Sequence, residues 1–237
     1  MFQTVAPATP GLNPASLTAA LAGLFPLGVV GAHLEGAAPV SLLTESELRA
    51  ISHCAEKRIG DFAAGRLCAR RALAEFGVHD YSLLSAPDRQ PLWPPGLLGS
   101  ITHTEGYSAA VVTRRGHLRS LGLDSETIAA VHEELWPRIL GASERACLGR
   151  LPEAARDTAA ALMFAAKEAF YKCQFTLTGE WLEFEDVHIE SPDWMQPLGR
   201  FSVQPQRPIR LQQQAGNIEG QFRVHAPYVT CGAALCA

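Results

Sequence analysis

The sequence predicts a mixed α+β fold arranged as two similar lobes, and two observations support this. Helical and strand patterns both occur along the 237 residues, and five short strand candidates follow one another in the last third. A faint duplication also links the two halves, because Ser46-Glu47 before an apolar pair recurs 97 residues later as Ser143-Glu144 (143 − 46 = 97). Each lobe is therefore expected to hold a small sheet packed with one long helix.

The two long helices extend the duplication and set the domain boundary. Arg66 and Arg70 on the first helix match Lys167 and Lys172 on the second (167 − 66 = 101; 172 − 70 = 102). Two lobes of about 110 residues follow, near the size of a small domain. We expect an N-terminal lobe over residues 1–120, a C-terminal lobe over 121–237, and an active cleft between them.

Composition narrows the class of protein. Hydrophobic residues make up 47% of the chain, which is ample for a core. The net charge of −4 and the pI near 6.1 give no general attraction to nucleic acid, so no nucleic-acid partner is expected. The six cysteines form no CxxC pair and no zinc spacing, which favours a reducing cytoplasmic location.

The N-terminal region is apolar from Leu17 to Val30 but does not match a signal peptide. Pro26 interrupts the run, and no Lys or Arg precedes Arg49. We expect a short helix over Ser16–Leu24 and a strand over Leu27–Leu34. No other stretch approaches the roughly 20 apolar residues of a membrane span, so none is expected.

A helical pair and a loop come next. Thr44-Glu45-Ser46-Glu47 matches a capping box, and the apolar spacing predicts a short helix followed by a longer one over Lys57–Phe76. Gly77 ends the longer helix. The Pro- and Gly-rich stretch Pro87–Gly99 predicts a loop, and Ser100–His103 then enters a strand edge.

A β-hairpin is predicted in the middle of the chain. Tyr107–Thr113 and Leu118–Leu123 have strand patterns, and Arg115-Gly116 forms the turn between them. This pairing would place Asp124 at a strand end.

The last third begins with a long helix. Pro152 suits its first turn, and the Ala-rich pattern continues to about Cys173. Five strand candidates follow Gly179: Trp181–Glu190, Gly199–Val203, Ile209–Gln213, Gln221–Val224 and Tyr228–Cys231.

Acidic residues in two of these elements point to a metal site. Residues two apart on a strand share a side, so Asp124 and Glu126 can present two carboxylates to one point. Residues four apart share a helix face, which groups Glu168 with Lys172. Three carboxylates suit a hard cation such as Mg²⁺, and the nearby lysine suits a polyphosphate substrate. Each pattern taken alone is also typical of a solvated surface.

Basic residues supply candidate anion contacts. His103 lies among small hydroxyl and glycine residues whose N–H groups favour anions, although a lone His is more often structural. Arg58 and Arg66 belong to a basic helix whose ordinary role is a solvated face. Gly65 would let a backbone or a ligand approach that helix. Arg89 lies in the Pro-rich loop and has the weakest independent support.

Five short motifs follow one another in a fixed order between about residues 55 and 190. They are Phe62-Ala63-Ala64-Gly65-Arg66-Leu67-Cys68-Ala69-Arg70, Arg89-x-Pro91-x-Trp93-Pro94, Gly99-Ser100-Ile101-Thr102-His103, Gly122-Leu123-Asp124-x-Glu126 and Phe164-x-x-Lys167-Glu168-x-x-Tyr171-Lys172. Each is common alone, whereas the ordered set is specific. The set resembles the 4′-phosphopantetheinyl transferases, above all the Sfp-type branch that includes the enterobactin-synthetase component.

The resemblance implies a fold and a reaction. The fold is two pseudo-symmetric α+β lobes with coenzyme A between them. The reaction moves the 4′-phosphopantetheine arm of coenzyme A to a serine of an acyl or peptidyl carrier protein and releases adenosine 3′,5′-bisphosphate. The resemblance does not tell whether the carrier protein belongs to fatty acid, polyketide or siderophore synthesis. Because one chain would contain both lobes, a monomer is expected.

The resemblance also assigns roles to residues. Asp124, Glu126 and Glu168 match the carboxylates that bind Mg²⁺, with Mn²⁺ as the alternative ion. Glu168 also matches the base that activates the carrier serine. Lys172 and His103 match groups that offset phosphate charge.

The remaining matches concern coenzyme A. Arg58, Arg66 and Arg89 correspond to its cationic contacts, and Thr102 stands where a phosphate-binding serine is frequent. At two positions the sequence departs from the residues usual in the family, and neither departure removes a charged group of the site. Phe164 replaces a common tryptophan, and Ser125 replaces a usual apolar residue, which should loosen that strand end slightly.

Two other functions fit the same residues. A magnesium-dependent phosphohydrolase acting on coenzyme A or another nucleotide would use water in place of the carrier serine. A non-catalytic protein that binds coenzyme A or a carrier would keep the cleft without turnover.

Overall fold

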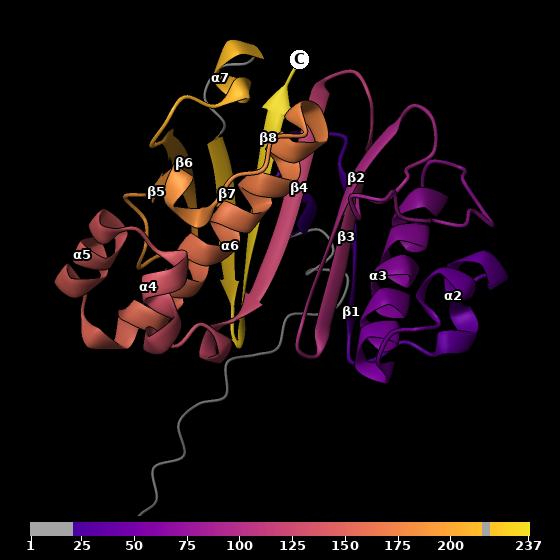
Figure 1. Cartoon of the computed structure of the whole chain (residues 1–237), viewed down its shortest axis with the longest axis horizontal. Helices are drawn as coiled ribbons and strands as arrows, with labels where there is room; N and C mark the ends of the chain where they lie inside the picture. The colour runs from indigo at the N-terminus through magenta and orange to yellow at the C-terminus, as the bar shows by residue number, and fades with distance from the viewer. Residues whose placement is uncertain (1–20, 215–218) are drawn as a thin grey trace, which may run out of the picture.

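The computed structural model describes residues 21–214 and 219–237, which form two antiparallel sheets with helices packed on them (Figure 1). The first sheet has the order β1-β3-β2 and consists of β1 (Val30–Glu35), β2 (Leu97–Thr104) and β3 (Tyr107–Arg114). The second has the order β4-β8-β7-β6-β5. Its strands are β4 (Leu118–Thr127), β5 (Val187–Glu190), β6 (Leu198–Pro205), β7 (Glu219–His225) and β8 (Tyr228–Cys236).

Each sheet has one long helix across it. In the first lobe α3 (Glu56–Ala74) packs on all three strands, beside α2 (Glu45–Ile51). In the second lobe α6 (Glu153–Thr178) packs on β4 and β8, and the shorter helices are α4 (Trp136–Ile139), α5 (Ala142–Arg150) and α7 (Arg210–Gln214). Short 3₁₀ turns lie at Val40–Leu42, Ile128–Ala130, Glu133–Leu135 and Phe184–Asp186. The α+β fold with two similar lobes is confirmed.

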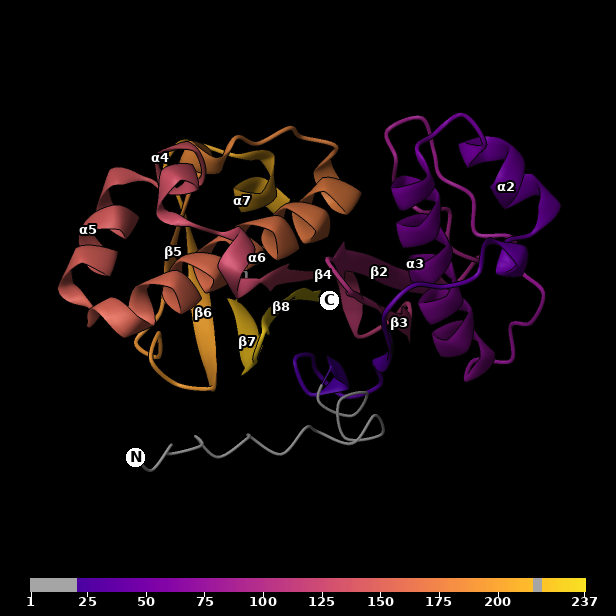
Figure 2. The same cartoon turned by 90° about the horizontal axis from the view of Figure 1, so that it is seen from below.

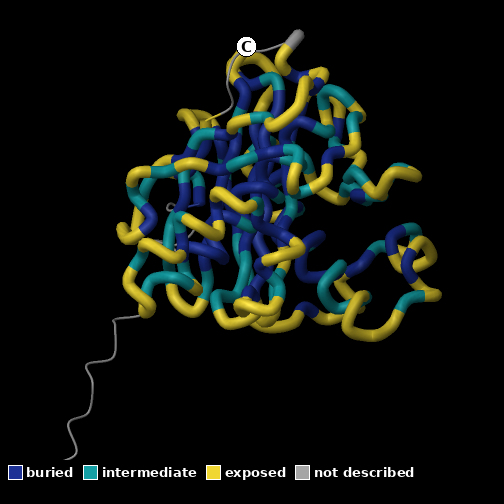
Figure 3. The backbone as a smooth tube through the Cα atoms, turned by 60° about the vertical axis from the view of Figure 1, so that its left-hand side comes forward, coloured by how far each residue is buried: buried dark blue, intermediate teal, exposed yellow. Residues whose placement is uncertain are grey.

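The core of the second lobe forms around α6, whose buried face is made mainly of alanines. Small side chains let the helix lie close to the sheet. At Gly122 of β4 the approach is closest, because a Cβ there would collide with the carbonyl of Ala169. Figure 3 shows buried residues gathered in the interior and exposed residues along the outer turns. Gly122 thus allows α6 to bring its charged residues directly onto β4.

Gly65 has a similar role on α3. A Cβ at this position would lie 2.8 Å from Cγ2 of Ile101 on β2, so the absent side chain makes room for a strand residue. The close neighbour that Gly65 admits is therefore a core side chain of the same lobe.

A buried glutamate links the short helix to the long helix in both lobes. Glu47 of α2 accepts hydrogen bonds from Arg70 of α3 and from the N–H of Leu83. Glu144 of α5 pairs with Lys167 of α6 at 2.6 Å and accepts from the N–H of Ile189. Both glutamates are fully buried. The duplication thus has a structural counterpart, but it matches Lys167 with Arg70, not with Arg66.

The two lobes meet where the edge strands β2 and β4 run side by side (Figure 1, Figure 2). Here N–H groups of β4 donate to side-chain hydroxyl groups of β2, and not to backbone carbonyls as in a continuous sheet. Ser100 Oγ, Thr102 Oγ1 and Thr104 Oγ1 accept from the N–H groups of Leu123, Ser125 and Thr127, at 3.0, 2.9 and 3.2 Å. We call these three contacts the hydroxyl ladder, and they fix β4 against the first lobe.

The predicted hairpin over residues 107–123 is wrong, although both strands exist. β3 pairs with β1 and β2, and β4 pairs with β8. The hairpin is β2–β3, which turns at Glu105-Gly106, where Gly106 has φ +73°. Alternation identifies a strand but not its partner, and the partner of β4 lies about a hundred residues further along.

Other elements also differ from expectation. Residues predicted as a strand over Ile209–Gln213 form α7, and Trp181–Glu190 is a strand only from Val187. Residues 16–20 of the first predicted helix lie outside the described part, and residues 21 and 22 are helical.

The boundary between the lobes can be compared with the sheets. The two sheets divide between Arg114 and Leu118, and the boundary at residue 120 stays a prediction. Of the helices in the described part, none is long and apolar enough to cross a membrane.

Candidate active site

The candidate site lies on the seam between the lobes and centres on Asp124 of β4. Asp124 is buried, and its Oδ1 accepts from Lys172 Nζ at 2.6 Å and from Thr102 Oγ1 at 3.1 Å. These partners come from α6 and β2, so three elements from both lobes converge on one carboxylate. The ion pair of Lys172 is with Asp124, not with Glu168 four residues earlier.

Asp124 keeps one oxygen without a partner. Its Oδ2 is buried and makes no hydrogen bond in the described structure. A buried acceptor of this kind is costly unless something pairs with it. Asp124 Oδ2 is therefore available as a ligand for a cation.

Two further carboxylates, Glu126 and Glu168, lie near enough to Asp124 to interact with its charge. Burial, together with the charges of Asp124 and Glu168, raises the pKa of Glu126 well above its usual range. Burial and Asp124 likewise raise the pKa of Glu168, while Lys172 opposes the shift. Among the described residues, no three acidic, His or Cys side chains are close enough to form a complete metal centre by themselves. The donors thus fit a hard cation in kind and charge, with further ligands to come from substrate and water.

His103 adds a second feature at the seam. Arg58 of α3 donates from Nη1 to His103 Nε2 at 3.2 Å. Because arginine has no acceptor, this nitrogen of His103 carries no proton here. Burial lowers the pKa of His103. The positive charges of Arg58 and Lys172 lower this pKa further, whereas the negative charges of Asp61 and Asp124 raise it. A neutral histidine and the guanidinium of Arg58 therefore lie near the carboxylates.

The structure separates Arg66 and Arg89 from that group. Arg66 is buried, donates to the Leu83 carbonyl and to Ser85 Oγ at 2.9 Å each, and stacks on Phe62. Arg89 occupies a turn at φ +71°, with its N–H bonded to the Ala86 carbonyl. Neither makes a hydrogen bond to the Asp124 group in the described structure, and their contacts with coenzyme A stay predictions.

An apolar pocket of about 180 Å³ opens beside Glu168. Its walls come from α6 and from the segment that follows it, and Trp181 packs edge-on against Tyr171 with ring centroids 5.5 Å apart. The lining residues are Lys167, Glu168, Phe170, Tyr171, Trp181, Leu182, Glu183, Phe184 and Val187. Its size and character suit a slim, largely uncharged chain.

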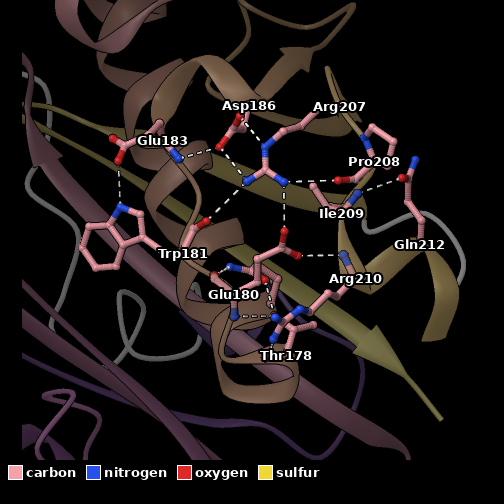
Figure 4. A network of polar contacts seen from close by, with 11 residues as sticks. Thr178, Glu180, Trp181, Glu183, Asp186, Arg207, Pro208, Ile209, Arg210 and Gln212 are labelled. Atoms are coloured by element: carbon pink, nitrogen blue, oxygen red, sulfur yellow. Dashed lines mark hydrogen bonds and ion pairs between the residues drawn. The ribbon is translucent and has the colours of Figure 1, made fainter.

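A polar network holds the wall of this pocket in place (Figure 4). Arg207 forms ion pairs with Asp186 and Glu180 at 2.7 and 2.9 Å and donates to the Trp181 carbonyl. From the inner side, Lys167 Nζ donates to the Phe184 carbonyl at 2.8 Å. The wall is therefore fixed at both its outer and inner surfaces.

Comparison with known proteins identifies the family. The sequence profile of the 4′-phosphopantetheinyl transferase N-terminal domain matches residues 45–113, and that of the 4′-phosphopantetheinyl transferase superfamily matches residues 120–228. The chain is 37% identical to the 4′-phosphopantetheinyl transferase Npt of Nocardia iowensis over 70% of this chain and 74% of Npt. The chain belongs to the 4′-phosphopantetheinyl transferase family. The resemblance and the expectation of a transferase are thereby confirmed.

Other relatives agree. The chain is 40% identical to the 4′-phosphopantetheinyl transferase PptT of Mycobacterium tuberculosis over 64% of this chain and 66% of PptT. It is also 40% identical to enterobactin synthase component D of Salmonella typhimurium, over 49% of this chain and 48% of that protein.

Some residues of the site were not predicted. The hydroxyl ladder has a signal in the sequence, because Ser100, Thr102 and Thr104 alternate along one strand. Arg207 has no such signal, since its role depends on the fold that brings it to the pocket wall. Ser125 does not loosen its strand end, because it is fully buried and bonds to Thr230 Oγ1 at 2.8 Å.

Proposed function

We propose that this chain transfers the 4′-phosphopantetheine arm of coenzyme A to a serine of an acyl or peptidyl carrier protein, in a reaction that depends on Mg²⁺. The observation that carries the proposal is the unpaired Asp124 Oδ2, with two further carboxylates, Glu126 and Glu168, near enough to interact with the charge of Asp124, within a chain of this family. Three acidic groups on a seam exceed the charge of the one lysine that pairs with them, and a divalent cation would balance the remainder.

The reaction is a phosphoryl-type transfer in which one bond to phosphorus forms and one breaks. The serine oxygen forms a bond to the β-phosphorus of coenzyme A, and the bond from that phosphorus to the bridging oxygen breaks. Adenosine 3′,5′-bisphosphate leaves with the bridging oxygen and its electron pair. Glu168 receives the serine proton, directly or through a water. Its raised pKa suits this role, because the carboxylate becomes a stronger base.

The other residues bind charge and exclude water. Asp124, Glu126 and Glu168 would hold the cation, which supplies positive charge to the pyrophosphate when bound. His103 and Arg58 lie on the N-terminal side of the seam, where they can donate to phosphate oxygens. Lys172 adds positive charge to the same place.

The apolar pocket gives the transferred arm a position. Pantetheine is a slim chain with two amides and one thiol, and the pocket of about 180 Å³ opens beside Glu168. An arm in this pocket would place its phosphate near the carboxylates. Tyr171 and Trp181 would shield it from water.

Two further expectations accompany the reaction. We place the protein in the cytoplasm, in line with its six free cysteines, three of which are buried. We also propose that it acts as a monomer, which light scattering would test.

The test is the intact mass of purified apo carrier proteins after incubation with this chain, coenzyme A and Mg²⁺, with an EDTA control. A gain of one phosphopantetheine arm that EDTA abolishes is the expected result. Consumption of coenzyme A without any gain on fatty-acid, polyketide or peptide carriers would instead identify a phosphohydrolase. Binding of coenzyme A with neither outcome would identify a non-catalytic protein.

A further inference from the structure

The segment Glu180–Asp186 forms the part of the apolar pocket that α6 does not form. It supplies Trp181, Leu182, Glu183 and Phe184 to the lining. Its regular structure is limited to the single 3₁₀ turn Phe184–Asp186, and the residues before that turn have neither helix nor strand. A segment with so few backbone hydrogen bonds depends on side-chain contacts to keep one shape.

Arg207 supplies those contacts by binding both ends of the segment (Figure 4). Its Nε and Nη2 donate to Asp186 Oδ1 and Oδ2 at 2.7 and 3.0 Å, and its Nη1 donates to Glu180 Oε1 at 2.9 Å. The carbonyls of Trp181 and Pro208 accept from the same guanidinium at 3.4 and 3.2 Å. A guanidinium has five N–H donors, and all five of Arg207 are thus engaged. We call its contacts with Glu180 and Asp186 the Arg207 clasp.

The geometry of the clasp is the kind that contributes to stability. A single ion pair on a surface usually contributes little, but bidentate pairs and networks are exceptions. The fork of Arg207 binds Asp186 through two oxygens while it also pairs with Glu180. The hydrogen bond from Arg207 lowers the pKa of Asp186 below its usual range, so the pair stays charged at neutral pH. Asp186 Oδ2 also accepts from the N–H of Glu183, which connects the clasp to the pocket lining.

Trp181 is held at several points although 67% of the residue is exposed. Its carbonyl accepts from Arg207, its indole Nε1 donates to Glu183 Oε1 at 2.9 Å, and its ring packs edge-on against Tyr171. The entropy of fixing this large side chain is therefore spent on folding. A ligand that enters the pocket meets a rigid apolar surface and does not have to order it.

We propose that Arg207 is a positioning residue for coenzyme A, which keeps the wall Glu180–Asp186 preformed for the pantetheine arm. This role rests on the proposed function, which places the arm in this pocket. Arg207 is not among the residues that line the pocket, so it acts through the wall. A preformed wall raises the affinity for the arm, because binding then carries no cost of ordering the wall. The nucleotide end of coenzyme A gains nothing from it.

The test compares two ligands that differ in the arm. Coenzyme A carries it, and adenosine 3′,5′-bisphosphate shares the nucleotide end but lacks it. Calorimetry with Mg²⁺ measures both ligands on the wild type, Arg207→Met and Arg207→Lys. Arg210→Met is the matched control, because the Arg210 side chain donates only to the Thr178 carbonyl, at 3.4 Å, in the described structure. The backbone N–H of Arg210, which donates to Glu180 Oε2, is kept in this variant.

Arg207→Met should bind coenzyme A about five- to tenfold more weakly and adenosine 3′,5′-bisphosphate within about twofold of the wild type, since only the arm needs the wall. Arg207→Lys should fall between the two, because a lysine keeps the charge but cannot form the bidentate fork. Arg210→Met should bind both ligands as the wild type does. In transfer assays, the loss in Arg207→Met should be found in the KM for coenzyme A more than in kcat.

Three results would overturn the assignment of Arg207. The first is a folded Arg207→Met that binds coenzyme A as the wild type does. The second is equal weakening of both ligands, which would mean a general defect of the site and not a loss at the arm. The third is an unchanged affinity for coenzyme A with a raised KM for the carrier protein, which would assign the wall to carrier docking. Melting temperatures show which variants are folded, and Arg207→Lys provides the same comparison should Arg207→Met not fold.

The wild type alone separates failure of this assignment from failure of the proposed function. A wild type that bound neither ligand would contradict the transferase itself. A wild type that bound coenzyme A no more tightly than adenosine 3′,5′-bisphosphate would contradict the placement of the arm in the pocket. If the wild type preferred coenzyme A and Arg207→Met kept that preference in full, the transferase would stand and only the role of Arg207 would fall.

Discussion

The two lobes share one scaffold and differ in what that scaffold presents at the seam. In each, a buried glutamate at the start of a short helix pairs with a cation on the long helix. Glu47 and Arg70 are 23 residues apart, and so are Glu144 and Lys167 (167 − 144 = 23). In each, the same glutamate also accepts a backbone N–H from beyond the long helix. The repeated unit therefore stabilises the fold of each lobe and takes no part in catalysis.

The difference begins one residue after the paired cation. Arg71 follows Arg70 and donates weakly to the His33 carbonyl, whereas Glu168 follows Lys167 and joins the carboxylates at the seam. The second lobe thus carries the acidic groups, and the first contributes Arg58, His103 and the hydroxyl ladder. One duplicated framework can therefore supply both the acidic and the basic groups of a single site.

The largest effect is expected from removing the acidic group that distinguishes the second lobe. Glu168→Gln should lower the rate of transfer by about 10²- to 10⁴-fold, because the carboxylate is both base and cation ligand. Arg71→Gln at the equivalent position of the first lobe should stay within a few fold. Initial rates of carrier modification at high Mg²⁺ measure both. Equal losses, or an active Glu168→Gln, would contradict the assigned asymmetry.

The buried ion pairs should differ in their effect on stability. Lys167→Met leaves a fully buried Glu144 unpaired and should cost about 3–5 kcal/mol of unfolding free energy. Arg70→Met should cost less, because 20% of the Arg70 side chain is exposed and water can reach Glu47. Urea unfolding compares the two variants. Adding Glu144→Gln to Lys167→Met should recover stability, and a larger loss in Arg70→Met would reverse the ranking.

Acid should destabilise the fold through a histidine of the second lobe. Burial holds the pKa of His225 at about 4, and Arg223 and His33 lower it further. Between pH 6.5 and 4 the unfolded chain therefore binds a proton that the folded chain does not, so stability falls as the pH falls. Above pH 7 this contribution is constant. We expect a loss of about 1–2 kcal/mol, reduced from the full shift because His225 is only half-buried.

The test of this loss uses one histidine from each lobe. Burial also lowers the pKa of His33, and the rings of His33 and His225 both pack against the ring of Tyr107. Unfolding curves at pH 7.5 and 5 should show a smaller pH effect in His225→Phe than in the wild type or in His33→Phe. An unchanged pH effect in His225→Phe would remove His225 as the cause.

The smallest effects concern the helix caps. Thr44 Oγ1 accepts from the N–H of Glu47, whereas Gly141 at the equivalent place has no side chain to do so. Thr44→Ala should cost about 1 kcal/mol, and Gly141→Ser should gain a few tenths. Gly141 has φ −66°, and a Cβ there meets only Glu144 Oε2, at 3.5 Å, so a serine fits. Melting temperatures test both, and a destabilised Gly141→Ser would mean that the caps are not equivalent.

The elements were largely predictable from the sequence, but their partners were not. The capping box at Thr44 and the long α6 follow from local spacing, and both are present. The pairing of β4 with β8 depends on contacts between distant residues, which alternation cannot reveal. The segment 209–213 shows the same limit, because its alternation resembles a strand while the fold makes it helical.

The site divides in the same way. Asp124, Lys172 and Thr102 were recognised from motifs, and the structure brings them into direct contact. The motif could not show that Lys172 donates to two strands, because this depends on how closely α6 lies on Gly122. Nor could it show that Lys167 turns away from the seam to Glu144. Motifs identify the groups, and packing decides which partner each group has.

The most direct test of the division between lobes is a titration of Mn²⁺ into the wild type, Asp124→Asn and Arg58→Ala, followed by electron paramagnetic resonance. We expect one bound ion per chain in the wild type, its loss in Asp124→Asn and its retention in Arg58→Ala. Mn²⁺ binding that survives Asp124→Asn unchanged would show that the second lobe does not hold the cation through Asp124.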